Sequence, residues 1–197
     1  MNKYKLTETT KTWCGITLYQ IQALISFGNI SKGELGGFIE KTENLADEGN
    51  AWVFGNAWVS GNAQVSGNAW VFGNAWVSGD ARVSGDALVY GDALVSGNAR
   101  VYGNARVFGN AQVYGNAWVF GNAQVSGDAR VYGDAQVSGD ALVSGDARVY
   151  GDAWVSGEIK LTSILCSRFN FEFDWQINLW NKLEKKFETE LKKKEVR

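Results

Sequence analysis

A six-residue repeat dominates the sequence. From Gly49 to Ser156 the chain reads as 18 consecutive hexapeptides of the form Gly, Asn or Asp, Ala, a variable residue, Val, then Ser, Tyr or Phe, without insertion or deletion. Ala and Val are two positions apart, so in an extended segment they point to one side while the variable and last residues point to the other. One hexapeptide cannot bury its apolar side alone, so the units must coil and stack.

Three hexapeptides per turn would make a triangular coil of 18 residues, and the array therefore predicts six coils filled by Val and Ala. At about 4.8 Å per coil, the column would be about 29 Å long. We expect the corners at Gly with Asn or Asp, because these residues tolerate left-handed or strained backbone angles at least cost. The chain contains no Pro, which suits strands that must all donate their amides to a neighbour.

The repeat, for example the run from Val53 to Trp58, resembles the hexapeptide-repeat proteins. That resemblance implies a left-handed parallel β-helix, and the handedness comes from the resemblance alone. The chain also resembles phage and prophage proteins that join Gly-Asn-Ala-x-Val arrays to an N-terminal box, which here spans Lys32 to Glu40 and is followed by Asn44 and Leu45. This second resemblance implies an origin in a mobile element and no particular activity.

Three regions follow from this pattern: an N-terminal β cap (1–48), the repeat β-helix (49–157) and a C-terminal region (158–197). Caps are expected because the ends of a strand stack would otherwise pair with other chains. In the first cap we expect a strand from Ile16 to Ile25, a turn at Gly28 and Asn29, and a strand at Phe38 and Ile39 that enters the first coil.

The C-terminal region predicts a strand followed by an amphipathic helix. Phe169, Phe171 and Phe173 alternate as in a strand, and Asp174 can cap a helix that continues to about Lys194. The apolar stripe of this helix would contain Ile177, Trp180, Leu183, Phe187 and Leu191. The helix could lie along the column or pack between subunits. The predicted fold is therefore an all-β solenoid with a β cap and one C-terminal helix.

The composition argues against enzymatic chemistry. The chain has no His, which excludes an imidazole base, the usual catalytic triads and His-containing metal sites. Many hexapeptide-repeat proteins are acyltransferases with a catalytic histidine, and no residue here matches it. We therefore expect no catalytic residue, no cofactor and no metal. A weak cation site at the stacked corner pairs Asp128/Asp146 and Asp134/Asp152 is the alternative to a structural role for these carboxylates.

Charge and cysteine content limit the partners and the location. The 19 Lys and Arg against 21 Asp and Glu give a net charge of −2, which argues against nucleic acid or an anionic membrane as the main partner. Cys14 and Cys166 are expected to be reduced structural thiols. With no apolar run typical of a signal peptide or membrane span, we expect a cytoplasmic protein.

The outward residues indicate an interaction surface. One face carries enough large apolar side chains on successive coils to exceed the patch that a soluble monomer tolerates. The chain's own termini, a second copy or a foreign partner could cover it, or the rings could simply stabilise strand stacking. Arginines beside rings, as in Arg100/Tyr102, Arg106/Phe108, Arg130/Tyr132 and Arg148/Tyr150, are expected to form cation–π contacts. The candidate interface residues are Trp52, Phe54, Trp70, Phe72, Leu88, Tyr90, Phe108, Trp58, Trp76, Trp180 and Phe187.

These features predict a non-enzymatic solenoid that acts through protein–protein contacts. We expect a homo-oligomer, either a dimer or a trimer. A narrower hypothesis, based on the phage resemblance, is an inhibitor of a host antiphage defence complex such as a CRISPR effector. The alternatives are an acyltransferase-like enzyme with a base other than histidine, and a structural component of a virion or polymer.

Overall fold

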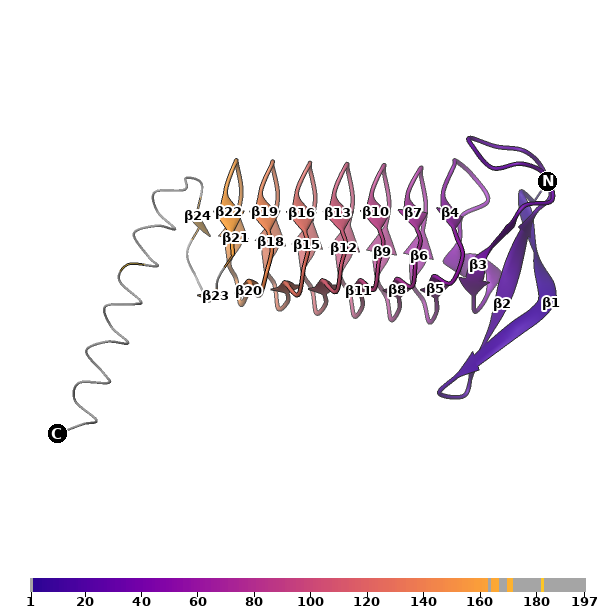
Figure 1. Cartoon of the computed structure of the whole chain (residues 1–197), viewed down its shortest axis with the longest axis horizontal. Helices are drawn as coiled ribbons and strands as arrows, with labels where there is room; N and C mark the ends of the chain where they lie inside the picture. Colours follow the sequence, from indigo (N-terminus) through magenta and orange to yellow (C-terminus); the bar gives the residue numbers. More distant parts are fainter. Residues whose placement is uncertain (1, 163, 167–169, 172–181, 183–197) are drawn as a thin grey trace.

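The computed structural model describes residues 2–162, 164–166, 170–171 and 182. These residues form an all-β, parallel β-solenoid of about seven coils, with a small β cap at its N-terminal end (Figure 1). Three sheets run along the column, and each coil contributes one strand to each sheet. The expected solenoid fold is confirmed, and the left-handed sense of the coil stays a prediction.

Two of the sheets have seven strands each and are named here after their first strand. The β4 sheet contains β4 (Trp52–Val53), β7 (Trp70–Val71), β10 (Leu88–Val89), β13 (Arg106–Val107), β16 (Gln124–Val125), β19 (Leu142–Val143) and β22 (Lys160–Leu161). The β6 sheet contains β6 (Gln64–Val65), β9 (Arg82–Val83), β12 (Arg100–Val101), β15 (Trp118–Val119), β18 (Gln136–Val137), β21 (Trp154–Val155) and β24 (Asn170–Phe171).

The third sheet has ten strands because the cap extends it. Its order is β1 (Tyr4–Trp13), β2 (Ile16–Ala23), β3 (Leu35–Ile39), β5 (Trp58–Val59), β8 (Trp76–Val77), β11 (Leu94–Val95), β14 (Gln112–Val113), β17 (Arg130–Val131), β20 (Arg148–Tyr150) and β23 (Ile164–Cys166). This β5 sheet is antiparallel between β1, β2 and β3 and parallel from β3 onward.

The strands pair in the register that the hexapeptides dictate. Trp52 pairs with Trp70 and Val53 with Val71, so neighbouring coils differ by the expected 18 residues. The coil also continues past residue 157, because β22, β23 and β24 pair in parallel with the last strands of the array. The expected C-terminal helix, with Trp180 and Phe187, lies outside the described residues.

The core contains the valines and alanines of the array. All 18 Val and all 18 Ala of the hexapeptides are at most 1% exposed. Burial of each Val contributes on the order of 1.5 kcal/mol before the cost of chain entropy, so the repeated interior is the main source of stability. Because each coil contacts mainly its neighbours, this stability accumulates coil by coil.

The corners differ from the expectation in one respect. Each array glycine from Gly49 to Gly151 has a positive φ, whereas no Asn or Asp of the described residues does. The glycines also stack: a Cβ on Gly97 would lie 3.0 Å from the nitrogen of Gly115 and 3.1 Å from its oxygen. Gly is therefore required by backbone angle and by space, and the prediction that Asn and Asp share the strained conformation is wrong.

The cap consists of the three antiparallel strands and a short 3-10 turn, η1 (Thr42–Asn44). The predicted strand at Phe38 and Ile39 is confirmed, and it pairs with β5 through Phe38 and Trp58. A bridge between Phe27 and Ile30 closes the predicted turn, and β2 matches most of the expected strand. Strand β1 was not predicted, since its polar, Thr-rich sequence has only a weak apolar alternation.

Candidate interaction surface

Trp52 does not belong to an exposed surface. Its side chain is fully buried, with the ring of Tyr4 at 6.1 Å and the ring of Phe27 at 5.4 Å between centroids. Its indole nitrogen has no hydrogen-bond partner among the described residues. The expectation that Trp52 lies in an exposed block is therefore wrong, because the cap covers the first coil of the β4 sheet.

The remaining apolar residues of the β4 sheet form a half-buried strip on its outer side. We define this apolar strip as Trp70, Phe72, Leu88, Tyr90 and Phe108. Phe54 lies at the cap end of the strip, where it packs against the core and contacts the ring of Trp70 at 5.3 Å. The strip therefore begins where the cap ends and continues over three coils.

The rings of the strip stack on one another. Phe72 and Tyr90 lie 4.7 Å apart and Tyr90 and Phe108 lie 5.0 Å apart, each pair with planes within 2° of parallel. The ring faces are therefore occupied by neighbouring rings. This arrangement stabilises adjacent coils and leaves ring edges for a partner, so it does not suit stacking of nucleobases on these rings.

The same stacking occurs at the other corners. Tyr114, Tyr132 and Tyr150 form a column with centroid distances of 4.9 and 5.1 Å, and Tyr102 stacks on Phe120 at 5.0 Å. Burial raises the pKa of Tyr102 and of Tyr114 above the ordinary tyrosine value. These side chains are neutral near pH 7, and they act as packing groups.

The cap covers part of the β5 sheet as well. Trp13, at the tip of the β1–β2 hairpin, lies 5.8 Å from the ring of Trp58 and 6.4 Å from that of Trp76. Lys11 from the same strand donates to Asn56 Oδ1 at 3.1 Å and lies 4.0 Å from the ring of Phe38. Trp13 itself remains 48% exposed. Intrachain cover, one of the expected alternatives, therefore applies to Trp58 and Trp76.

The indole nitrogens of two tryptophans bond to serines of the preceding coil. Trp76 Nε1 donates to Ser60 Oγ at 3.3 Å, and Trp154 Nε1 donates to Ser138 Oγ at 3.2 Å. Ser60 and Ser138 are buried by this contact. The Ser at the sixth position of a hexapeptide thus has a role that the repeat pattern did not reveal.

The expected arginine–aromatic pairing differs in its direction. In the described part of the array, the Arg that lies over a ring is Arg100, and the ring is that of Trp118, 4.9 Å away on the next coil. The prediction of pairing with Tyr102 on the same strand is therefore wrong for Arg100. The sheet places equivalent positions of adjacent coils closer together than positions two apart on one strand.

Ladders of side-chain hydrogen bonds run along the corners. Asn Nδ2 donates to the Oδ1 of the Asn or Asp 18 residues later, at 2.8–3.1 Å. Each run ends on Asp, because a carboxylate accepts but cannot donate. The runs are Asn50–Asn68–Asp86, Asn62–Asp80, Asn74–Asp92, Asn98–Asn116–Asp134, Asn104–Asn122–Asp140 and Asn110–Asp128.

Polar side chains of the cap contact the first coil. Lys3 is buried, and its Nζ donates to Ala51 O at 2.9 Å and to Gly49 O at 3.4 Å. Burial lowers the pKa of the Lys3 amine to about 8, against the opposing effect of Asp47. The hydroxyl of Tyr4 lies 2.7 Å from Thr42 O and 2.9 Å from Leu45 O, and burial raises its pKa above the ordinary tyrosine value.

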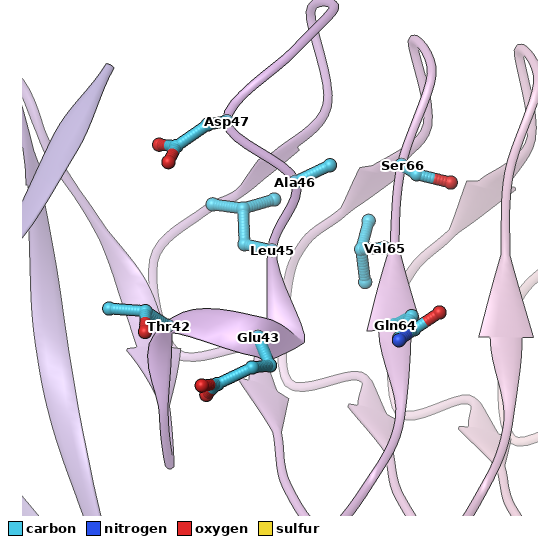
Figure 2. A pocket seen from close by; sticks show the side chains of 8 residues that line it. All are labelled: Thr42, Glu43, Leu45, Ala46, Asp47, Gln64, Val65 and Ser66. Carbon is cyan, nitrogen blue, oxygen red and sulfur yellow. The ribbon is translucent and has the colours of Figure 1, made fainter. Parts of the chain in front are cut away.

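Two shallow depressions lie beside the cap. One is bordered by the carboxylates of Glu43 and Asp47, which in Figure 2 extend away from Gln64 and Ser66. The other lies between the Gly28–Asn29 turn and the first corner ladder. Neither depression brings a candidate nucleophile together with a base. Their linings are Thr42, Glu43, Leu45, Ala46, Asp47, Gln64, Val65 and Ser66 for the first, and Gly28, Asn29, Asn50, Asn68, Trp70, Asp86 and Leu88 for the second.

Within the described ranges, no group of three or more Asp, Glu or Cys side chains is arranged to hold a metal ion. Asp128 and Asp134 instead accept ladder bonds from Asn110 and Asn116. Cys14 is a free, exposed thiol at the hairpin tip. No helix in the described part of the chain has the length and apolar character needed to cross a membrane.

Comparison with known families agrees with this geometry. The model of the YdcK beta solenoid repeat matches seven segments of the array, at residues 63–79, 81–97, 99–111, 111–125, 123–139, 135–147 and 143–157. The chain is a β-solenoid protein with repeats of the YdcK type. No curated protein matches it. The repeat similarity identifies the fold, and it assigns no activity to the surface.

Proposed function

We propose that the protein is a non-enzymatic binding scaffold that acts through protein–protein contacts. The observation that supports this is the apolar strip, in which half-buried Trp, Leu and aromatic rings lie on three adjacent coils of a rigid sheet. Large apolar side chains on a fixed surface are typical of interaction sites. Because the ring faces are stacked on each other, the strip offers ring edges and aliphatic groups, which suit a protein surface.

The proposal includes a homo-oligomer, a dimer or a trimer, as one way to cover the strip. Sedimentation equilibrium should then show a closed species of two or three chains. The double variant Trp70→Glu with Phe72→Glu should shift that species toward the monomer, since it places two carboxylates within the contact. A variant that keeps the wild-type mass would show that the strip does not join the subunits.

A partner from the host cell is the second part of the proposal. The resemblance to phage and prophage arrays favours a bacterial antiphage defence complex, such as a CRISPR effector, and an inhibitory role. Affinity capture from host lysate with mass spectrometry should recover subunits of such a complex with the wild-type protein. The Trp70→Glu, Phe72→Glu variant should lose them.

The matched control carries the same added charge elsewhere. The variant Gln64→Glu with Gln136→Glu places two carboxylates on the β6 sheet and should retain the partner. Circular dichroism of both variants checks that the solenoid remains folded. An unchanged set of captured proteins in the Trp70→Glu, Phe72→Glu variant would contradict the proposal, and so would saturable calorimetric binding of an acyl-coenzyme A donor, which indicates the enzymatic alternative.

A further inference from the structure

The hydrogen bonds of the column all run in one direction. Backbone amides of one coil donate to carbonyl groups of the next coil, as from Arg100 N to Ala117 O at 2.9 Å. The first coil therefore has carbonyl groups with no preceding array coil to supply amides. An unsatisfied row of this kind is costly when buried and pairs with other chains when exposed.

In a regular coil, two amides serve each corner. The corner residue donates to a Gly carbonyl and the variable residue donates to the Ala carbonyl two positions later. Asn98 N bonds to Gly115 O at 2.8 Å, and Arg100 N bonds to Ala117 O. A cap that closes the first coil must supply the same two bonds at each corner.

Two side chains of the cap supply these bonds. Lys3 Nζ donates to the carbonyls of Gly49 and Ala51, at 3.4 and 2.9 Å. Asn44 Nδ2 donates to the equivalent carbonyls at the next-but-one corner, Gly61 O at 3.0 Å and Ala63 O at 2.8 Å. In both cases one nitrogen takes the place of two backbone amides.

The other carbonyls of the first coil receive ordinary backbone amides. Phe38 N donates to Ala57 O at 2.9 Å, Glu40 N to Val59 O at 3.0 Å and Ala46 N to Val65 O at 2.9 Å. The cap is therefore a partial coil, completed by Lys3 and Asn44 at the positions where it has no strand.

Both side chains are held rigidly for this role. Lys3 is 2% exposed and its amine lies 4.9 Å from the ring of Phe27. Asn44 is 0% exposed, and its Oδ1 accepts a bond from Lys41 N at 2.9 Å. Burial of polar groups is costly unless they are hydrogen-bonded, and here each one offsets the cost by satisfying two carbonyls.

We propose that Lys3 and Asn44 act as surrogate strand amides that close the first coil, so that this end of the column cannot accept the last coil of a second copy. The partner that fits an opened end is chemically defined. It must present a row of strand amides with the spacing of these carbonyls, and the amide-bearing end of another copy does so. Such contacts would be head-to-tail and would not close on themselves.

The test uses substitutions that remove the donors and keep the shape. Asn44→Asp keeps the acceptor for Lys41 N but replaces the donating amide with a carboxylate that faces two carbonyls. Lys3→Met keeps the length of the side chain and removes the amine. We expect at least tenfold faster hydrogen exchange at the amides of Phe38, Glu40 and Ala46, and unchanged exchange at Gln112 in the middle of the column.

Sedimentation velocity tests the second half of the proposal. Each variant should form species larger than the wild-type protein, and their size should grow with concentration. Lys5→Met and Asn29→Asp make the same chemical changes at exposed cap positions and should behave as wild type. Lys3→Arg retains the donors and should protect the cap amides better than Lys3→Met. Unchanged exchange in Asn44→Asp would overturn the closing role, and an unchanged sedimentation profile would overturn the block on self-association.

Discussion

Asn68 donates a hydrogen bond from its Nδ2 to Oδ1 of Asp86, 2.9 Å away on the next coil. Asn68 also accepts a bond from Asn50 at 3.1 Å, so its amide links three coils. A side chain that both donates and accepts can continue a ladder, whereas Asp can only end one. The choice between Asn and Asp at a corner therefore decides where each ladder stops.

Asn68→Asp should destabilise the solenoid. The variant loses the bond to Asp86 and places two carboxylates on adjacent coils, which should lower the free energy of unfolding by about 1 kcal/mol. Urea unfolding followed by circular dichroism measures the change. Asn29→Asp adds the same charge at an exposed turn outside the ladders and should have a smaller effect. Equal effects of the two substitutions would mean that the ladder bond contributes nothing.

Gly97→Ala should be more destabilising than Gly55→Ala. Both glycines have a positive φ, which costs an Ala about 1–2 kcal/mol at either position. A Cβ on Gly97 would also lie 3.0 Å from Gly115 N, whereas a Cβ on Gly55 meets nothing within 4 Å. The difference between the two melting temperatures therefore isolates the close stacking of glycines. If the two variants melt together, the coils can separate at the corner at no measurable cost.

Cys14→Asn should stabilise the β1–β2 hairpin. Cys14 and Gly15 connect Trp13 to Ile16 with φ values of 48° and 81°, so both turn residues are left-handed. A turn of this kind favours Asn followed by Gly, and Cys is poorly suited to the first position. We expect slower hydrogen exchange in β1 and β2, equivalent to about 1 kcal/mol. Cys14→Ala, which removes the thiol but keeps the backbone strain, should not show this gain.

The stability of the protein should depend on Lys3 in alkaline solution. The folded protein holds the Lys3 amine at a pKa of about 8, whereas the ordinary value is 10.5. Between these values the unfolded chain binds more protons, so the contribution of Lys3 to stability rises as the pH rises from 8 to 10.5, by at most about 3 kcal/mol. Asp47 is the charged group that opposes this shift.

Comparison of the wild-type protein with Lys3→Met isolates that contribution. The difference between their free energies of unfolding should be constant below about pH 7 and should change across pH 8 to 10.5. Tyr4, whose pKa is raised, acts in the opposite sense above pH 10 and is present in both proteins. A difference that stays flat to pH 10.5 would show that the amine is not desolvated in the folded state.

The coil could be predicted from the sequence because one physical rule acts at every repeat. Ala and Val two positions apart define the buried side, and Gly marks each corner, so 18-residue register and core composition follow directly. The cap strand at Phe38 and Ile39 was accessible for the same reason, since it resembles a strand that enters the first coil.

The surface was less predictable because it depends on contacts between distant segments. Burial of Trp52 under Tyr4 and Phe27 requires the path of the cap, which the repeat does not encode. The roles of Lys3 and Asn44 have no local signal either, since each is a single polar residue outside the array. The Asn and Asp ladders could have been inferred, because the 18-residue period places corner residues in columns.

The triangular coil makes the chain sensitive to the length of any insertion or deletion. Removal of 18 residues would delete one storey of the column and leave every later side chain on its original wall. Removal of a single hexapeptide would instead rotate everything after it by one third of a turn, so that Trp118 would move from its place under Arg100 to a different wall. Natural or engineered length variants should therefore keep their surface only when whole storeys are gained or lost.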